Sequence, residues 1–365
     1  EIARSAKQVG LDFIILNDHS YMTDSLHLQD EGFYKGLLVL LGLEIGGRYH
    51  HYLAYDIKEM IHGQSLGPQE VIDEVNAQGG FGFLAHPFEK GMPFTEKSLA
   101  YTWNDLSVTG YTGVCIWNFS SRWKERIKSL FHGLFFLLFK SQFLKAPSQK
   151  TLSFWDKLCQ QKKTVGIGGS DAHGSLFRWH GIRITPLSYE LLLNSINVHI
   201  LMDKPLSEDF VEAKRAIYEA LRHGRAFIVH ENLAPAKGFN YYYVSDEGWH
   251  MSMGEERPFQ PGTLFIELPK EGEIRLIRDG IVEKHRRGVN EQQRRQILEQ
   301  LGIGHLGQQE EERGGRESLD AEHPTPFDGA ELQPRDDIVG QEGQQDTEHD
   351  VELRYGHEAA AQPGR

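Results

Sequence analysis

Residues 10–20 read GLDFIILNDHS, a largely apolar run that ends directly in polar side chains capable of binding metal. A short run of this kind is typical of a parallel strand that is buried on both faces. Residues 37–45 (LLVLLGLEI) repeat the pattern, and residues 52–57 are expected to form a short strand after a turn at Gly46 and Gly47. The beginning of the chain therefore predicts buried strands with chemically active residues at their ends.

Helix-like segments alternate with further strand-like segments along the chain. Pro68 begins a helix that carries Val71, Ile72 and Val75 on one face, and the glycines at 79 and 80 end it. Strands are also expected at 81–85, 113–117 and 164–168, and helices at 122–144 and 152–162. This alternation predicts an α/β fold with a mostly parallel sheet, which is either open or closed into a barrel.

Four of these strand ends carry residue types that bind metal ions. In α/β sheets and barrels the functional residues gather at the carboxyl ends of the strands, so these side chains are expected to converge. Imidazoles and carboxylates together suit Zn, Mn or Fe, and several carboxylates allow neighbouring metals to be bridged. The candidate metal ligands are Asp18, His19, Glu44, His51, His86, Asp171 and His173.

Each candidate also has an ordinary structural interpretation. A single histidine in a turn is usually a surface or hydrogen-bonded residue, and Asp18 and Asp171 are both placed to cap a helix N-terminus. Glu44 is harder to explain in this way, because a carboxylate that ends a largely apolar run needs a partner such as a metal or an arginine. The metal hypothesis therefore depends on the whole set of residues rather than on any one of them.

An ordered set of short segments resembles successive motifs of the PHP (polymerase and histidinol phosphatase) family. The segments are GLDFIILNDHS, GLEIGG followed by HHYLAY, FLAHPF, GVCIWN and IGGSDAH, and they lie roughly within residues 1–185. The resemblance implies a distorted (β/α)7 TIM-like barrel and about two to three divalent metal ions, commonly zinc or manganese. It also implies a phosphoesterase, or another hydrolase of the same family.

The resemblance assigns a role to each candidate. His19 would be a metal ligand, and Asp18 would either bind metal directly or orient His19 from behind. Glu44 would bridge two metals, and His51 and His86 would bind one of them. The closing pair of ligands would be Asp171 and His173.

Metal-assisted hydrolysis is the mechanism that this resemblance implies, with a metal lowering the pKa of the attacking water. Glu44 and Asp171 would hold the metals, and His173 is one conceivable acid for the leaving group. A phosphate ester would also need a cationic partner. The preferred candidate is Arg178 in GSLFRWHG, followed by Arg48 and Lys90, although each is more often a solvated surface charge.

Two departures from the family pattern bear on activity. The opening His-x-His strand is absent, and the early His27 has neither the spacing nor the strand, so the sequence is expected to be a fragment that lacks its first strand and two ligands. Cys115 stands where the family often has Glu. It could be a soft metal ligand, but a core-facing cysteine in an apolar strand is the preferred interpretation.

Three functions remain open at this stage. The first is a phosphoesterase that acts on small phosphorylated molecules or nucleotide ends. The second is a hydrolase of non-phosphate esters or amides at the same site, which is favoured by the apolar residues 130–139 and by few obvious phosphate-binding residues. The third is a PHP binding module that has lost its metals, favoured by the missing His-x-His and by Cys115.

Composition limits the partners and the compartment. The formal net charge is −13, which argues against a general nucleic-acid-binding surface, and no transmembrane segment is expected. The two cysteines, Cys115 and Cys159, form no disulfide framework and no metal-spaced pair, which fits a reducing compartment, and a cytoplasmic location is expected. No signal peptide is visible, although a missing start would hide one equally well.

The chain is expected to divide into three parts. Residues 1–203 would form the metallohydrolase barrel, and residues 204–285 would form a helix capped by Ser207 and a small antiparallel β-domain. Residues 286–365 carry no Lys or Trp and hold 18 acidic against 9 basic residues, which predicts a disordered tail or a shifted reading frame.

Residues 130–139 (LFHGLFFLLF) are too short to span a bilayer, which takes about 20 residues. They could form a lid over the site or a helix at a membrane surface. A helix packed against the barrel is the preferred interpretation.

Overall fold

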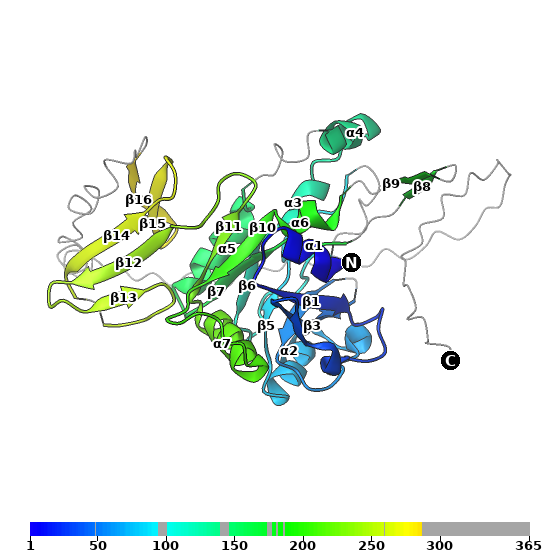
Figure 1. The fold of residues 1–365 in the computed structure, drawn as a ribbon, viewed down its shortest axis with the longest axis horizontal. Coiled ribbons are helices and arrows are strands. Elements are labelled where there is room, and N and C mark those ends of the chain that lie inside the picture. Colours follow the sequence, from blue (N-terminus) through cyan, green and yellow to red (C-terminus); the bar gives the residue numbers. More distant parts are fainter. Residues whose placement is uncertain are drawn as a thin grey trace, which may run out of the picture.

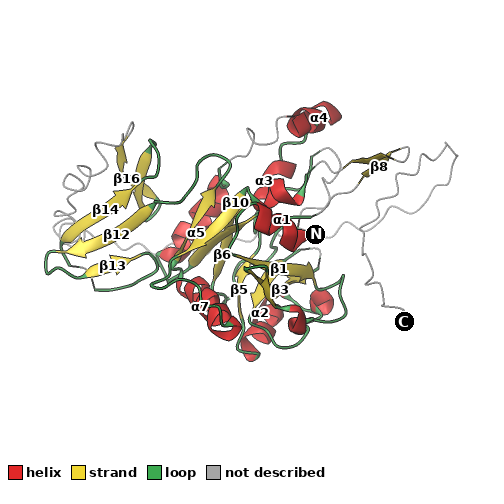
Figure 2. Cartoon of the chain, viewed as in Figure 1, coloured by secondary structure: helices red, strands yellow, loops and turns green. Residues whose placement is uncertain are grey.

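The computed structural model describes residues 1–47, 49–93, 101–138, 146–173, 177–179, 182–184, 187–258 and 260–286. Its centre is a strongly curled sheet with helices on its outer face (Figures 1 and 2). In spatial order the sheet contains β1 (Phe13–His19), β3 (Leu37–Gly46), β4 (His51–Tyr55), β5 (Phe81–Leu84), β6 (Gly113–Asn118) and β7 (Val165–Gly169), while β2 (Gly32–Tyr34) pairs with β3. All six of the predicted strands of this region are present, and β1 continues further than expected, through His19.

Strand β4 runs opposite to its two neighbours in this sheet, and β2 also runs antiparallel to β3. β1 pairs in parallel with β3, and β5, β6 and β7 pair in parallel with one another, but β4 runs antiparallel to both β3 and β5. A short turn after β3 causes this reversal, since a parallel connection would need a long crossover. Gly46 makes the turn possible: it has φ 146°, and a Cβ there would lie 1.7 Å from the His50 carbonyl oxygen.

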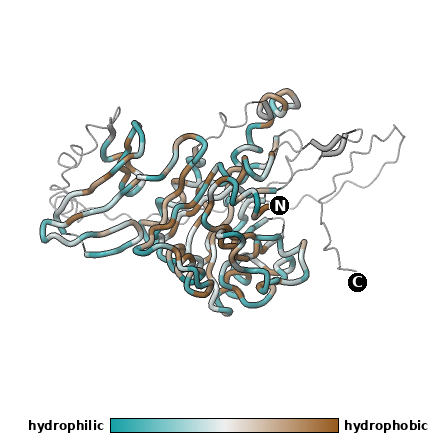
Figure 3. The backbone as a smooth tube through the Cα atoms, in the orientation of Figure 1, coloured by the Kyte–Doolittle hydropathy of each residue, from teal (hydrophilic) through white to brown (hydrophobic). Residues whose placement is uncertain are grey.

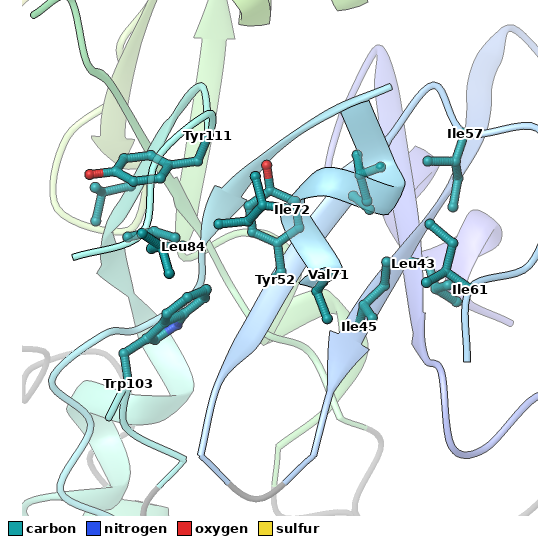
Figure 4. Packing of buried hydrophobic residues seen from close by; sticks show 14 residues of the cluster. Leu43, Ile45, Tyr52, Ile57, Ile61, Val71, Ile72, Leu84, Trp103 and Tyr111 are labelled. Atoms are coloured by element: carbon teal, nitrogen blue, oxygen red, sulfur yellow. The ribbon is translucent and has the colours of Figure 1, made fainter. Parts of the chain in front are cut away.

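Helices cover the sheet and complete the core. They are α1 (Ile2–Gln8), α2 (Pro68–Ala77), α3 (Phe119–Lys124), α4 (Leu130–Leu138), α5 (Gln149–Cys159), α6 (Tyr189–Leu193) and α7 (Phe210–His223), with short 3-10 turns at Leu28–Asp30 and Gly63–Ser65. Val71, Ile72 and Val75 of α2 pack on Leu43 and Tyr52 of the sheet, as the spacing of its apolar residues predicts (Figure 4). No helix within the described ranges combines the length and apolar character that a membrane crossing requires.

A fully closed (β/α)7 barrel is not observed among the described residues. The main sheet ends at β1 on one side and at β7 on the other, and β10 (Ile196–Ile200) and β11 (Ala226–His230) form a separate antiparallel pair that packs beside β7. The fold is therefore a mixed α/β half-barrel, and closure stays a prediction. The strand β10 was not expected from the sequence.

The second part of the chain is an antiparallel lobe that stands to one side of the sheet (Figure 1). It contains β12 (Asn240–Ser245), β13 (His250–Ser252) and β14 (Gly262–Glu267) in one sheet and β15 (Ile274–Arg278) with β16 (Ile281–Arg286) in another. Away from this lobe, β8 (Phe177–Trp179) pairs only with β9 (Ile182–Ile184) among the described strands. The expected small antiparallel sheets are thus present. Residues 287–365 lie outside the described residues, so the predicted tail stays a prediction.

Two details of this second part differ from expectation. Ala213, Ile217 and Leu221 of α7 pack in the core of the main sheet, and β11 pairs with β10, so both elements associate with the half-barrel rather than with the lobe. The predicted division at residue 203 therefore separates elements that share a core, and the domain division itself stays a prediction. Asp209 rather than Ser207 caps α7, because its carboxylate accepts the backbone N–H of Glu212.

Helical structure is present in the region near residues 122–144, as predicted. The chain forms α3 and α4 there with a break between them, and residues 139–145 lie outside the described residues. α4 stands away from the body of the molecule (Figure 1), and Phe131 is 85% exposed. The preferred expectation, a helix packed against the barrel, does not hold for the described part of this segment.

Candidate functional site

Ladder register brings the predicted residues to one edge of the sheet. His19 and Glu44 are direct partners in the parallel ladder of β1 and β3. His51 begins the antiparallel strand β4 opposite Gly46, so its imidazole lies at the edge where β3 ends. His86 follows β5 at the same edge, and the backbone N–H of Ala85 donates to the His51 carbonyl oxygen at 2.9 Å. Three strands and one turn thus direct their polar residues to one place.

Glu44 lies at the centre of this convergence. Its Oε1 is 2.5 Å from His51 Nδ1 and 3.4 Å from His86 Nε2, while its Oε2 faces His19 Nδ1 at 3.8 Å. The carboxylate is only 6% exposed, which is a costly position for a charge without compensating partners. Each of its two oxygens faces a different histidine environment, as a bridging carboxylate requires.

The electrostatics of Glu44 and His86 reflect this packing. Burial alone would raise the pKa of Glu44, but the adjoining imidazoles of His51 and His86 outweigh burial and hold that pKa well below its usual range. Burial alone would lower the pKa of His86, but Glu44 and Glu89 raise it to about 9. In the absence of metal, the fold therefore holds the pair as an ionised carboxylate and an imidazolium.

Asp171 and His173 complete the site after β7. His173 Nδ1 lies 3.1 Å from Asp171 Oδ1, and Nε2 of His173 lies 3.2 Å from Nε2 of His19. Coulombic attraction to Asp171 raises the pKa of His173 to about 9, and the same pairing holds the pKa of Asp171 below its usual range despite burial. We refer to Glu44, His51 and His86 as the inner group and to His19, Asp171 and His173 as the outer group.

Backbone conformation is unusual at two of the predicted ligands. His86 has φ 28° and Asp171 has φ 51°, both in the left-handed region that residues other than glycine rarely adopt. Such conformations cluster at functional sites, where the surrounding structure holds them in place. Around Asp171 that support comes from Ser120, whose hydroxyl donates to the carbonyl oxygens of Ser170 and Asp171.

The donor atoms fit a metal ion. Ligand atoms of His19, Glu44 and His51 all lie within 4.8 Å of one another, and no other such group of three occurs among the described residues. Nδ1 of His19 is buried without a hydrogen-bond partner, and Nδ1 of His51 lies against the Glu44 carboxylate. A buried nitrogen without a partner beside a buried carboxylate is what a divalent cation would satisfy.

Other predicted residues are placed less decisively. Asp18 is exposed and lines the same cavity, and strand alternation directs its side chain away from the face that His19 occupies. Its role as a ligand stays a prediction. Arg48 and the side chain of Arg178 lie outside the described residues, while Lys90 is exposed. The proposed cationic partner for a phosphate therefore stays a prediction as well.

Cys115 lies on β6 with its side chain buried beside the site. Its Sγ is 3.9 Å from the Trp117 carbonyl oxygen. Burial raises the pKa of the thiol to about 12, so it is uncharged at neutral pH. Cys115 also belongs to the apolar cluster of the main sheet, which agrees with the core-facing interpretation.

Two residues of the site were not singled out from the sequence. Glu89 is 6% exposed, and its Oε2 lies 3.4 Å from Nδ1 of His86, on the side of the ring away from Glu44. Asn118 donates from Nδ2 to Asp171 Oδ2 at 3.2 Å. A sequence signal exists for each: Glu89 is three residues after a histidine in HPFE, and Asn118 ends the strand GVCIWN.

A cavity of about 1330 Å³ opens beside the two groups. It follows β1 from Gly10 to His19 along the edge that does not pair with β3, and β10 lines its other wall. Its lining combines site residues with apolar side chains such as Met22 and Phe33. The cavity is large enough for a drug-sized organic molecule, for which typical pockets measure about 300 to 1,000 Å³.

Comparison with known proteins gives little beyond this geometry. No family model matches the chain, and no curated protein matches it. A crystal structure of a two-domain protein from Bacteroides vulgatus, which is described as containing a predicted PHP-like metal-dependent phosphoesterase, is similar over 74% of this chain and 72% of its own, at 14% identity and a TM-score of 0.37. A likeness at this level carries no argument, so the function rests on the site itself.

Proposed function

We propose that this chain is a metal-dependent hydrolase of the PHP type, with Glu44 bridging divalent metal ions. The observation that carries the proposal is the buried Glu44 carboxylate, whose two oxygens face His51 and His86 on one side and His19 on the other. Imidazoles and carboxylates that meet at one buried point are the ligand types of zinc, manganese and iron sites. The ordered PHP-like motifs support the same proposal.

In this proposal His51 and His86 of the inner group would hold one metal ion and His19 and Asp171 of the outer group another, with Glu44 shared between them and His173 left free of metal; the ions would be zinc, manganese or iron. When bound, the metal supplies Lewis-acid polarisation of the electrophile and lowers the pKa of water. Asn118 fixes the Asp171 carboxylate by donating to Oδ2, and Ser120 holds the backbone beneath it. These contacts would keep a ligand in place without reorganisation during the reaction.

His173 is the proposed acid for the leaving group. Its side chain is 44% exposed and lines the cavity, so a substrate atom can approach the ring. In the metal-free chain, attraction to Asp171 raises its pKa to about 9, so the imidazole carries a proton at neutral pH. A proton held at this position can be donated to an alkoxide as it leaves.

The preferred substrate is a phosphate ester on a small molecule, including a nucleotide end. Phosphoryl oxygens suit a site with paired divalent ions, because the metals neutralise charge that develops on those oxygens. The large cavity would take the organic part of such a substrate. Arg178 is the proposed cationic partner of the phosphate.

A carboxylic ester or amide is the second candidate substrate, and one observation favours it. Among the described residues that line the cavity, Lys204 is the one Lys or Arg, and the lining also includes Asp12, Asp18, Glu208 and Glu231. A doubly charged phosphate would meet mainly carboxylates away from the metals, whereas a neutral ester would not.

Metal content measured by elemental analysis tests the proposal, with Glu44→Ala beside the unaltered chain. Two or three equivalents of zinc, manganese or iron that fall sharply in Glu44→Ala are expected. A folded chain that binds no metal after loading, also when extended upstream, would contradict the hydrolase proposal and favour a binding module. Hydrolysis of an aryl phosphate compared with an aryl carboxylic ester then separates the two substrates.

A further inference from the structure

The helix α4 exposes a cluster of large apolar side chains. Phe131 is 85% exposed, Leu134 is 57% exposed and Phe135 is 45% exposed. Their spacing of three and four residues places them on one face of the helix. The helix projects from the body and is largely coloured as hydrophobic (Figure 3). Exposed apolar side chains that gather on a projecting element mark an interaction site.

The sequence around α4 differs in charge from the rest of the chain. Residues 126–155 contain no Asp or Glu and include Arg126, Lys128, Lys140, Lys145 and Lys150, although the whole chain has a formal net charge of −13. Lys128 is exposed directly before the helix. An apolar helix within a cationic, acid-free segment has the combination that anionic lipid surfaces attract.

The size of the helix excludes insertion across a bilayer. α4 has nine residues, whereas a crossing takes about 20. A helix of this length can still lie at the level of the lipid headgroups with its apolar face toward the acyl chains. Phe131 and Leu134 would then be buried in lipid while Lys128 stays among the headgroups.

We infer that α4 docks the protein on an anionic lipid surface, with Phe131 and Leu134 entering the interface and Lys128 contacting lipid phosphates. The inference does not depend on the proposed hydrolase function. The two are linked along the chain, because α3 follows β6 directly, α4 begins after the next five residues, and Asn118 at the end of β6 contacts Asp171.

Vesicle sedimentation of the full chain tests this inference. The probes are vesicles of phosphatidylcholine alone and vesicles with about one third phosphatidylserine. Binding to the anionic vesicles, and weaker binding at high salt, is expected. A Phe131→Ser, Leu134→Ser double variant should lower the partition coefficient at least ~10-fold, and Lys128→Glu should lower it roughly fivefold or more.

A matched control is available on another surface. Val211 and Leu233 are each 69% exposed, so Val211→Ser with Leu233→Ser removes similar apolar surface outside the segment. This variant should bind vesicles as the unaltered chain does, and all variants should keep the same circular dichroism and melting temperature.

Three outcomes would overturn the inference. The first is no binding to anionic vesicles, and the second is equal binding by the Phe131→Ser, Leu134→Ser variant. The third is a dimer in solution that this variant dissociates without any vesicle binding, because a second copy would then cover α4. Loss of metal binding would contradict only the hydrolase proposal.

Discussion

Glu44, His51 and His86 lie on or beside three neighbouring strands, whereas Asp171 and His173 follow the last strand of the main sheet. The inner residues are 6%, 2% and 8% exposed, while the side chain of His173 is 44% exposed. The strand ladder fixes Glu44, His51 and also His19, whereas Asn118 at the end of β6 and Ser120 of α3 hold Asp171 through side-chain contacts. The inner group is thus the more enclosed of the two, and the outer group is the more exposed through His173.

Asp171→Asn gives the largest expected effect on this comparison. The amide keeps the shape but removes the charge that pairs with His173 and that the outer metal requires. We expect metal affinity at the outer group to fall by about 100-fold or more, since loss of indirect partners alone costs about 10 to 100-fold. Metal titration followed by calorimetry should show one strong site retained at the inner group.

The contrary result would be equal loss of all metal in Asp171→Asn. That would show one inseparable cluster rather than two groups of different character. Glu247→Gln is a suitable control, because Glu247 is exposed and lies in the antiparallel lobe.

The next largest effect is the pH dependence of the unfolding free energy of the metal-free chain, to which His86 of the inner group contributes. The pKa of His86 is raised to about 9 in the folded chain, above the value of about 6.5 for a free histidine. Its contribution is therefore fully present below about pH 6.5 and is lost as the pH rises through about 9. We expect the metal-free chain to lose on the order of 2 kcal/mol of unfolding free energy across this window.

Urea unfolding at about pH 6 and about pH 9, with a chelator present to remove metal, measures this difference in unfolding free energy. His86→Gln should remove most of it. His173→Gln should remove less, because the more exposed His173 is screened by water although its pKa is also raised to about 9. A larger effect from His173→Gln would reverse the comparison between the two groups.

Glu89→Gln tests whether the inner group is oriented from behind. Glu89 contacts Nδ1 of His86, so Nε2 of that ring points toward Glu44. Losing the carboxylate should weaken metal binding at the inner group by ~10-fold, with little change at the outer group. Competition with a coloured chelator measures the affinity. An unchanged affinity in Glu89→Gln, with normal binding by the unaltered chain, would limit Glu89 to a structural role.

Much of this geometry follows from local sequence patterns. The runs before His19 and Glu44 predict buried strands, and the glycine turn before His51 places β4 beside β3. The glycine turn is also too short for a parallel connection, so the reversed direction of β4 was available from the sequence although a mostly parallel sheet was expected. The predicted site residues converge because strand ends share an edge.

Other features depend on contacts that no local pattern carries. Glu89 has no apolar periodicity around it, and only the turn at His86 brings its carboxylate back to the imidazole. β10 is a five-residue strand without a strong signal, and its pairing with β11 spans the whole of α7. The apolar sequence of α4 is compatible with a buried helix and with an exposed one, since composition does not specify a packing partner.

Cys115→Ala has the smallest expected effect, and it tests whether Cys115 belongs to the metal site or to the core. Cys115 is buried beside the site, and its side chain packs in the apolar cluster of the main sheet, as a core residue does. We expect unchanged metal content and a loss of ~1 kcal/mol in unfolding free energy from the small cavity. A fall of one metal equivalent in the folded variant would make Cys115 a ligand instead, and the apolar face of β6 would then belong to the metal site rather than to the core.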